Sequence, residues 1–215
     1  MRTELGSYGT GLVSDALDTL GINGGLAGLS RRSGAGVVCG PAFTLSFEPV
    51  PEGERAPAAD FIDEVPPGSV VVIANAGRTY CTVWGDILTG LAITKGIAGT
   101  VIDGCCRDVD EISAMDYSVW SLGSYMKSGK NRVRMAAAQV PVELCGTRVW
   151  PGDLICADGA GVLVVPARRA AEVAANAERI AEIETLIRAE LDSGMPLAQA
   201  RLRHGYNRAA LRAAS

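Results

Sequence analysis

The sequence predicts one mixed α/β domain that ends in a helical arm, and three observations support this. Short apolar runs at 69–76, 99–104 and 117–124 alternate with helix-like segments, which is the order of a parallel sheet with crossover helices. Residues 141–166 contain three short β-rich runs separated by Pro-Gly and Asp-Gly turns, as in an antiparallel patch. Residues 167–192 are Ala-rich and carry apolar residues at helical spacing.

Composition narrows the class of protein. Of the 215 residues, 48% are hydrophobic, which is enough for a sizeable core. A net charge of −4 gives no electrostatic attraction to nucleic acid or anionic lipid, so we expect neither as a partner. No run of about 18 apolar residues and no apolar leader is visible, and the six cysteines form no CxxC pair. We therefore expect a cytoplasmic, reduced protein without a zinc knuckle.

The first third of the chain predicts three kinds of structure. Residues 9–20 place apolar side chains on one helical stripe, and Gly21 ends that helix. Residues 22–34 are expected to be an irregular loop. Residues 36–47 alternate and are rich in β-formers with a Gly-Pro break, which predicts two strands or one bent strand. A short helical piece is expected at 58–65 within a polar loop.

The remaining elements follow from the same patterns. Residues 86–95 and 108–115 are expected to be helices between the buried strands, and residues 124–134 a basic loop. Gly194 and Pro196 should end the long helix. We expect residues 1–194 to be a single domain, and the basic amphipathic segment 195–215 to be a helical tail that contacts another copy of the chain.

Two acidic positions and an arginine define the candidate site. Asp86 should lie in the first turn of its helix, and Arg107 and Asp108 directly follow the buried strand 99–104. Parallel strands bring their carboxyl ends, and the helices that start there, to the same edge of a sheet. We therefore expect these three side chains to converge although they are distant in sequence.

The chemistry of these groups is complementary. An arginine fork and the free amides of Ile87 and Leu88 can bind a carboxylate, and the two aspartates can bind a divalent cation such as Mg²⁺, partly through water. An α-keto acid would satisfy both, with the cation stabilising an enolate. The alternative from these residues alone is a surface salt bridge or a helix cap.

The same segment resembles a known family. Asp86, twenty further residues and then Arg107-Asp108 match the signature of the RraA-like family, which includes class II 4-hydroxy-4-methyl-2-oxoglutarate/4-carboxy-4-hydroxy-2-oxoadipate aldolases, and Glu111 fits a further acidic position. Other matching stretches are VSDALDTLG, WGD, RVWPGDLICADGAGVLVVP and AEIETLIRAELDSG, in that order. The resemblance implies a mixed-sheet β/β/α fold of the swivelling-domain type, and a homotrimer or dimer of trimers with its active site between subunits.

The resemblance also implies roles for the residues. Asp108 would bind the divalent metal, Mg²⁺ or Mn²⁺, and Asp86 would hold a metal-bound water. Arg107, with the Ile87 and Leu88 amides, would hold the substrate carboxylate. A glutamate from a neighbouring subunit's long helix would complete the site. ETLIR makes Glu184 the first candidate for it and Glu182 the second.

The implied reaction is retro-aldol cleavage of a 4-hydroxy-2-oxo acid to pyruvate and a second oxo acid through a metal-bound enolate, and oxaloacetate decarboxylation would use the same enolate. Two alternatives stay open. One is a specialised-pathway lyase on the same scaffold. The other is a non-catalytic regulator, since some members of the family inhibit an RNA-degrading enzyme by protein contact.

Three further features have competing interpretations. A Schiff-base lysine would have to be Lys95, Lys127 or Lys130, and Lys95 is expected at a helix C-terminus. Cys105-Cys106 are expected to be packing residues, because a cysteine nucleophile needs a histidine and the only one is His204 in the tail. The basic loop 124–134 is either a solvated face or the source of a second carboxylate contact from Lys127 or Arg132.

Overall fold

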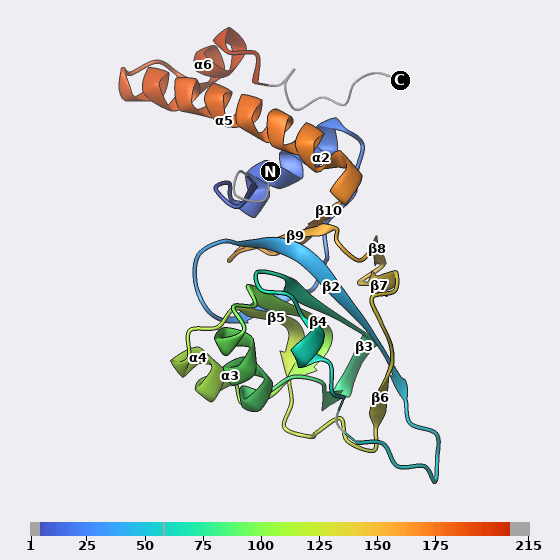
Figure 1. Ribbon diagram of the computed structural model, residues 1–215. Coiled ribbons are helices and arrows are strands. Elements are labelled where there is room, and N and C mark those ends of the chain that lie inside the picture. Colours follow the sequence, from blue (N-terminus) through green and yellow to red (C-terminus); the bar gives the residue numbers. More distant parts are fainter. Residues whose placement is uncertain (1–4, 58, 207–215) are drawn as a thin grey trace.

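The fold is built around one large mixed sheet, as a computed structural model of residues 5–57 and 59–206 shows (Figure 1). The strands are β1 (Ser30–Ser33), β2 (Val38–Pro49), β3 (Val70–Thr82), β4 (Gly99–Cys106), β5 (Val119–Ser124), β6 (Val133–Ala138), β7 (Val142–Leu144), β8 (Thr147–Val149), β9 (Leu154–Ala157) and β10 (Val162–Val165). The helices are α2 (Thr10–Thr19), η1 (Ile62–Glu64), α3 (Asp86–Thr94), α4 (Val109–Ala114), η2 (Ala167–Arg169), α5 (Ala170–Asp192) and α6 (Leu197–Arg203).

The sheet has a parallel centre and antiparallel edges. Its strands follow the order β1-β5-β4-β3-β2-β9-β10, with β6 also paired to β2 and with β7-β8 as a separate hairpin. The pairs β2-β3, β3-β4 and β4-β5 are parallel. The strand–helix–strand pattern therefore correctly predicted the parallel section, and α3 and α4 are its crossover helices.

Strand β2 is one continuous strand, which resolves the alternatives left open by the Gly-Pro break. Val38–Pro41 pair with β9, Ala42–Ser46 with β3, and Leu45–Pro49 with β6. Pro41 is tolerated in this strand because β2 changes partners at that point. The parallel pairing with β3 begins at Ala42, so the missing N–H of Pro41 costs no hydrogen bond of that ladder.

Strand β3 is longer and less regular than the apolar run 69–76 predicts. Its partner on β4 moves only from Asp103 to Cys105 while β3 itself advances from Ala74 to Thr82. Ala76 and Gly77 have positive φ angles of 49° and 67°, so the extra residues bulge out of the ladder. The bulge returns the chain to the end of β4, where the candidate site lies.

Three buried clusters form the core, one for each layer of the molecule. The first lies between the sheet and α3, α4 and η1, and includes Phe43, Ile73, Trp84, Ile112 and Tyr117. The second lies on the opposite face beneath β7-β8 and includes Val72, Trp120, Leu144, Val149 and Ile155. The third joins β9 and β10 to α2 and α5 and includes Val13, Leu17, Val165, Val173 and Ile180.

The helical arm, which consists of α5 and α6, lies at the opposite end of the molecule from α3 and α4 (Figure 1). Helix α6 folds back on α5, where Ala200 is fully buried and Arg203 pairs with Glu190 at 2.8 Å. The oligomer role of the tail stays a prediction, and its residues 207–215 lie outside the described part. Within the described part of the chain, no helix combines the length and apolarity needed to cross a bilayer.

Several sequence expectations need correction. The loop expected at 22–34 contains β1, because Ser30–Ser33 pair with the edge of β5. Residues 141–166 form four short strands rather than three. The helical piece is only the 3-10 turn η1; Ala58 itself is not described. The basic loop ends at β6, whose residues pair with β2 although three consecutive alanines give little β signal.

Candidate active site

The ends of β3 and β4 bring the predicted site residues together. Helix α3 begins at Asp86, shortly after β3, and Arg107 directly follows β4. The Arg107 backbone N–H donates to the Trp84 carbonyl at 3.0 Å, and the Asp86 N–H lies 3.3 Å from Asp108 Oδ2. The convergence expected from parallel strands is therefore present in a single chain.

Asp108 is held in an unusual backbone conformation. Its φ of 55° and ψ of 41° are left-handed, which aspartate tolerates better than most side chains. Its Oδ2 accepts the Asp86 amide and lies 3.1 Å from Arg107 Nε. The terminal nitrogens of Arg107 have no partner within the described residues, so the guanidinium can still bind an anion.

The start of α3 is fixed from inside the protein. Trp84 Nε1 donates to Thr89 Oγ1 at 2.9 Å, and this hydroxyl donates to the Gly85 carbonyl at 3.0 Å. Trp84 also stacks on Tyr117, with ring centroids 6.1 Å apart. Since Trp84 and Thr89 are buried, these contacts hold the helix start at a defined place beside β4.

The two backbone amides predicted to bind substrate differ in whether they already have a hydrogen-bond acceptor. The Ile87 N–H donates to Asp86 Oδ1 at 2.8 Å, so Asp86 already occupies it. The Leu88 N–H has no acceptor among the described residues. Of the two, only the Leu88 amide is available without a movement of the Asp86 side chain, and the predicted role of Ile87 requires that movement.

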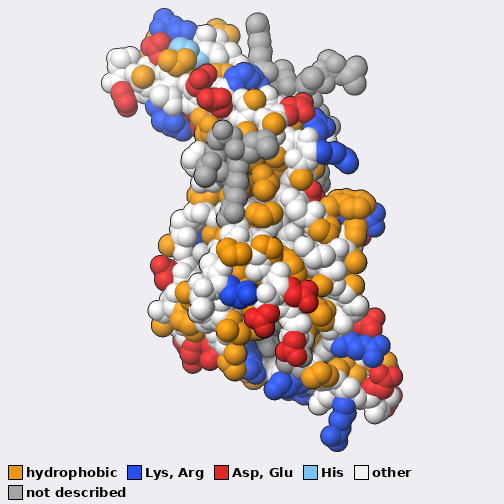
Figure 2. All heavy atoms as spheres, in the orientation of Figure 1, with side chains coloured by type: hydrophobic (Ala, Val, Ile, Leu, Met, Phe, Trp, Pro, Cys, Tyr) orange, Lys and Arg blue, Asp and Glu red, His pale blue; other side chains and the backbone are white. Residues whose placement is uncertain are grey.

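A cavity of about 580 Å³ opens beside these groups. Asp86, Ile87, Leu88 and Arg107 line it, and Lys130 lines it from the basic loop. Its other walls come from β2, the 57–64 segment, the chain between the end of β3 and α3, α3 itself, the basic loop and the start of β6: Phe47, Pro57, Ala59, Asp60, Phe61, Ile62, Asp63, Glu64, Thr82, Val83, Trp84, Gly85, Leu91, Ser128, Gly129 and Val133. Figure 2 shows acidic and basic side chains close together on the lower half of the molecule, where Figure 1 places α3, α4 and the end of β6.

The donor set fits a hard divalent cation that keeps part of its water shell. The Asp108 carboxylate lies at the Asp86 backbone amide, so the two aspartates are neighbours at the start of α3, and Mg²⁺ is commonly held by one or two carboxylates plus water. The described residues contain no group of three or more His, Cys, Asp or Glu that could hold a metal.

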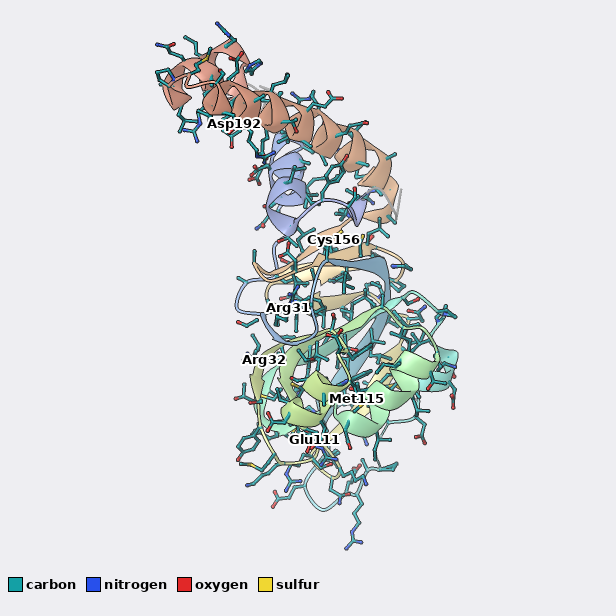
Figure 3. The ribbon with its side chains drawn as sticks, turned by 90° about the vertical axis from the view of Figure 1, so that its left-hand side faces the viewer. Arg31, Arg32, Glu111, Met115, Cys156 and Asp192 are labelled. Carbon is teal, nitrogen blue, oxygen red and sulfur yellow. The ribbon has the colours of Figure 1, made fainter. Side chains whose placement is uncertain are left out.

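The C-terminal glutamates are not part of this site in the same chain. Glu184 forms an ion pair with Arg188 at 2.6 Å on α5, and both Glu184 and Glu182 belong to the helical arm. Figure 3 shows Glu111, near the start of α4, and Asp192, at the end of α5, at opposite ends of the molecule. A glutamate of α5 can reach this site only from another copy of the chain.

Burial supports the packing role of the two cysteines. It raises the pKa of both Cys105 and Cys106, which keeps them as neutral thiols rather than nucleophilic thiolates. His204 contacts Glu190 at the end of the arm, so it cannot act as their base. Lys95 donates to the Asp63 carbonyl at 2.9 Å at the C-terminus of α3, where a cation is favoured.

Sequence reasoning missed two parts of the cavity. Lys130 lines the cavity, although the sequence indicates it only as a possible Schiff-base lysine, whereas Lys127 and Arg132, the expected carboxylate contacts, do not line it. The wall formed by Asp60, Phe61 and neighbours was also missed, because a polar loop gives no periodic signal. The run GKNRVR indicates the basic loop, but the fold decides that Lys130, an exposed side chain, is the cation of this loop that borders the cavity.

Comparison with known proteins adds to this geometry. Residues 10–164 match the family model described as RraA-like, Aldolase/RraA. The chain belongs to the RraA-like family. The resemblance found in the sequence is thus confirmed, and so is the RraA-like mixed α/β fold with a C-terminal helix.

Relatives within the RraA-like family carry different descriptions. The chain is 44% identical to the Legionella pneumophila protein DlpA over 196 residues, which are 90% of this chain but only 32% of DlpA. It is 32% identical over 164 residues to a Halalkalibacterium halodurans protein named "Putative 4-hydroxy-4-methyl-2-oxoglutarate aldolase", covering 76% of this chain and 75% of that one.

Solved RraA-like structures superimpose closely on the chain. An uncharacterized protein from Pseudomonas syringae pv. tomato matches with a TM-score of 0.86 and 44% identity, covering 93% of this chain and 96% of that one. Streptomyces coelicolor RraAS2, described as an unusual member of the RNase ES inhibitor RraA protein family, matches with a TM-score of 0.78 and 30% identity, covering 87% and 94%.

Proposed function

We propose that the protein is a divalent-metal-dependent lyase that cleaves a 4-hydroxy-2-oxo acid to pyruvate and a second oxo acid. The observation that carries this proposal is the convergence of Arg107, Asp108 and Asp86 beside a cavity that Arg107 and Asp86 line and that is large enough for such a substrate. The aldolase names of relatives support it. Oxaloacetate decarboxylation would use the same groups, because it also leaves the enolate of pyruvate.

Substrate binding would use Arg107 and the start of α3. The terminal guanidinium nitrogens and the Leu88 amide are the donors left for the carboxylate next to the keto group. Arg107 Nε stays on Asp108, so the arginine would hold the substrate and the metal-binding carboxylate in a fixed relation.

Proton transfer would use Asp86. Its Oδ1 is occupied by the Ile87 amide, which leaves Oδ2 to accept a proton through a bound water. Removal of the proton from the C4 hydroxyl breaks the C3–C4 bond, and the electron pair moves to the C2 oxygen. Protonation at C3 then gives pyruvate.

Asp108 would bind the metal, Mg²⁺ or Mn²⁺, and Asp86 would hold one of its waters. When bound, the cation supplies positive charge that stabilises the developing charge on the keto oxygen. Asp108 needs its contacts with the Asp86 amide and with Arg107 Nε for this role, because they hold its carboxylate at the start of α3.

The direct test is pyruvate release from oxaloacetate and from 4-hydroxy-4-methyl-2-oxoglutarate, with Mg²⁺ and with a chelator. The substitution Asp108→Asn keeps the size of the side chain and tolerates the left-handed backbone, so the fold should remain while metal-dependent turnover is lost. Full turnover by Asp108→Asn, or turnover that is indifferent to chelator, contradicts the proposal.

A shared site would also require more than one copy of the chain. We propose a homotrimer or a dimer of trimers in which Glu184 from one copy completes the site of the next. Each of Glu184→Gln and Arg107→Ala should then be inactive alone, and subunit exchange between them should restore part of the activity. A mixture that stays inactive, although exchange is shown by mass, contradicts the shared site.

One observation favours a different function. The likeness to RraAS2 makes inhibition of an RNA-degrading enzyme the second candidate. Wild-type protein that releases pyruvate from neither substrate but inhibits an RNase E-type enzyme would support the regulator. Since a regulator needs no metal, its inhibition should survive both chelation and Asp108→Asn.

A further inference from the structure

We propose that Lys130 binds the distal carboxylate of a dicarboxylic substrate, at the end of the cavity away from its keto group, and so selects diacids over monoacids. This inference rests on the lyase function proposed above and adds a specificity-determining residue to it. Lys130 lines the same cavity as Arg107 and Asp86. It comes from the basic loop, of which residues 125–132 lie between β5 and β6, and not from the ends of β3 or β4.

The basic loop is tied firmly to its surroundings. The Thr82 N–H donates to the Lys127 carbonyl at 2.9 Å, next to a bridge between Thr82 and Ser128. Asn131 and Ala56 exchange two hydrogen bonds, of 3.0 and 3.1 Å. The loop therefore holds its residues at defined positions beside the cavity, as a binding group requires.

Gly129 allows the loop to approach the end of β3. A Cβ atom at this position would lie 2.6 Å from the Thr82 carbonyl oxygen, which is backbone and cannot move aside cheaply. A larger residue would push the loop outward and carry Lys130 away from the cavity. The glycine thus sets the distance between the lysine and the site.

The other cations of the loop are not available for substrate. Arg132 Nη1 donates to the Ser128 carbonyl at 3.1 Å and to the Lys130 carbonyl at 3.4 Å, so its guanidinium holds the loop in shape. Lys127 does not line the cavity. The Lys130 ammonium has no ion-pair partner within the described residues, which leaves its charge available to a ligand.

The charge pattern of the cavity gives the proposal its specificity. Asp60, Asp63 and Glu64 line the cavity along with Lys130 and would repel a free carboxylate. Arg107 and Lys130 are the cations among the described residues that line the cavity, so Lys130 is the cation left for a second carboxylate when Arg107 holds the first. With Arg107 on the carboxylate next to the keto group, the substrate would be held at both ends, with the bond to be broken between them.

The test uses two unreactive ligands of equal length, 2-oxoglutarate and 2-oxopentanoate, which differ by one carboxylate. Calorimetry with Mg²⁺ should show that the wild type binds the diacid more tightly than the monoacid. In Lys130→Ala, the affinity for 2-oxoglutarate should fall by about 10- to 100-fold, the usual loss of a charge-assisted contact, and the affinity for 2-oxopentanoate should change little. Lys130→Glu should reverse the preference. Lys127→Ala, on the same loop, should bind both like the wild type.

Several outcomes overturn the inference. Equal losses for both ligands in Lys130→Ala would assign the lysine to the shared oxo-acid end or to the loop itself. No loss, or no binding of either ligand by the wild type, would also contradict it. Trapping of Lys130 by pyruvate and borohydride would make it a Schiff-base residue instead. Binding selectivity without any pyruvate release would leave this inference standing and reject the lyase.

Discussion

At the scale of single residues, the site depends on how closely the two chain segments approach. The φ of Gly85 is −162°, an extended value that any residue can adopt, so its conformation does not require glycine. The lack of space at this position does require glycine, because a Cβ on Gly85 would lie 2.5 Å from Asp108 Oδ2 and 3.3 Å from Arg107 Nε. A glycine before the helix is therefore what lets the Asp108 carboxylate reach the Asp86 amide.

Gly85→Ala should displace the Asp108 carboxylate and lower pyruvate release by about 100-fold, the cost of a misplacement on the order of 1 Å. Gly90→Ala is the matched control on the same helix, because nothing lies within 4 Å of its added Cβ. It should keep full activity and stabilise the fold by about 0.5–1 kcal/mol. Equal activity of the two variants, measured at saturating Mg²⁺, would show that this approach does not matter.

At the scale of elements, the start of α3 is the part that the site depends on most. The sequence predicted the position of this helix, but not its buried face: of the apolar residues assigned to that face, Ala92 is buried, whereas Ile87 and Leu91 are exposed. It could not predict the Trp84–Thr89–Gly85 chain of hydrogen bonds, since those residue types have many possible partners. The bulge in β3 and the strand β6 were likewise missed, because tertiary pairing overrides weak local preference there.

Thr89→Val should destabilise the protein by about 1–3 kcal/mol, because it leaves the buried Trp84 Nε1 without an acceptor. Thr94→Val is the control, since Thr94 makes the same bond to the carbonyl four residues earlier but is exposed. We expect it to change stability by less than about 0.5 kcal/mol. Urea unfolding measures both, and comparable losses would assign the effect to valine in a helix and not to Trp84.

At the scale of the whole molecule, one carboxylate ties the start of helix α2 to the sheet, in addition to the apolar packing of α2 on β9 and β10. Asp158 accepts hydrogen bonds from the Thr10 N–H and hydroxyl, both at 2.7 Å, and from the Ala160 N–H at 2.8 Å. Partial burial opposes its ionisation, but these bonds hold the pKa of Asp158 below its ordinary 3.8. The ionised form is thus the one that links α2 to the β9–β10 turn.

The pKa of Asp158 predicts a pH-dependent contribution to stability. A lowered folded-state pKa stabilises the protein at pH values above the unfolded pKa, and this contribution disappears as the pH falls through the folded value. Asp158→Asn should therefore cost about 1 kcal/mol near neutral pH, or about 2–4 °C in Tm, and progressively less below pH of about 4. A difference in Tm between the two proteins that is constant with pH would contradict this.

The parts of the site differ in how far the sequence predicts them. The Asp86, Arg107 and Asp108 cluster followed from one topological rule, that parallel strands end at one edge. Lys130 did not, because it reaches the cavity through contacts between Thr82 and the basic loop that no periodicity records. Glu184 remains a prediction, since a residue supplied by another copy leaves no trace in the contacts of one chain.

Strand β2 is shared by both ends of the molecule, and this has a consequence for dissecting the protein. The same strand supplies a ladder to β9, beneath the helices, and to β3, beside the cavity. No cut in the chain can separate a helical fragment from a cavity fragment and leave both of these β2 ladders intact. We therefore expect amide protons of β9 and β3 to exchange in one global event, so that agents which loosen the distant arm also reduce occupancy of the cavity.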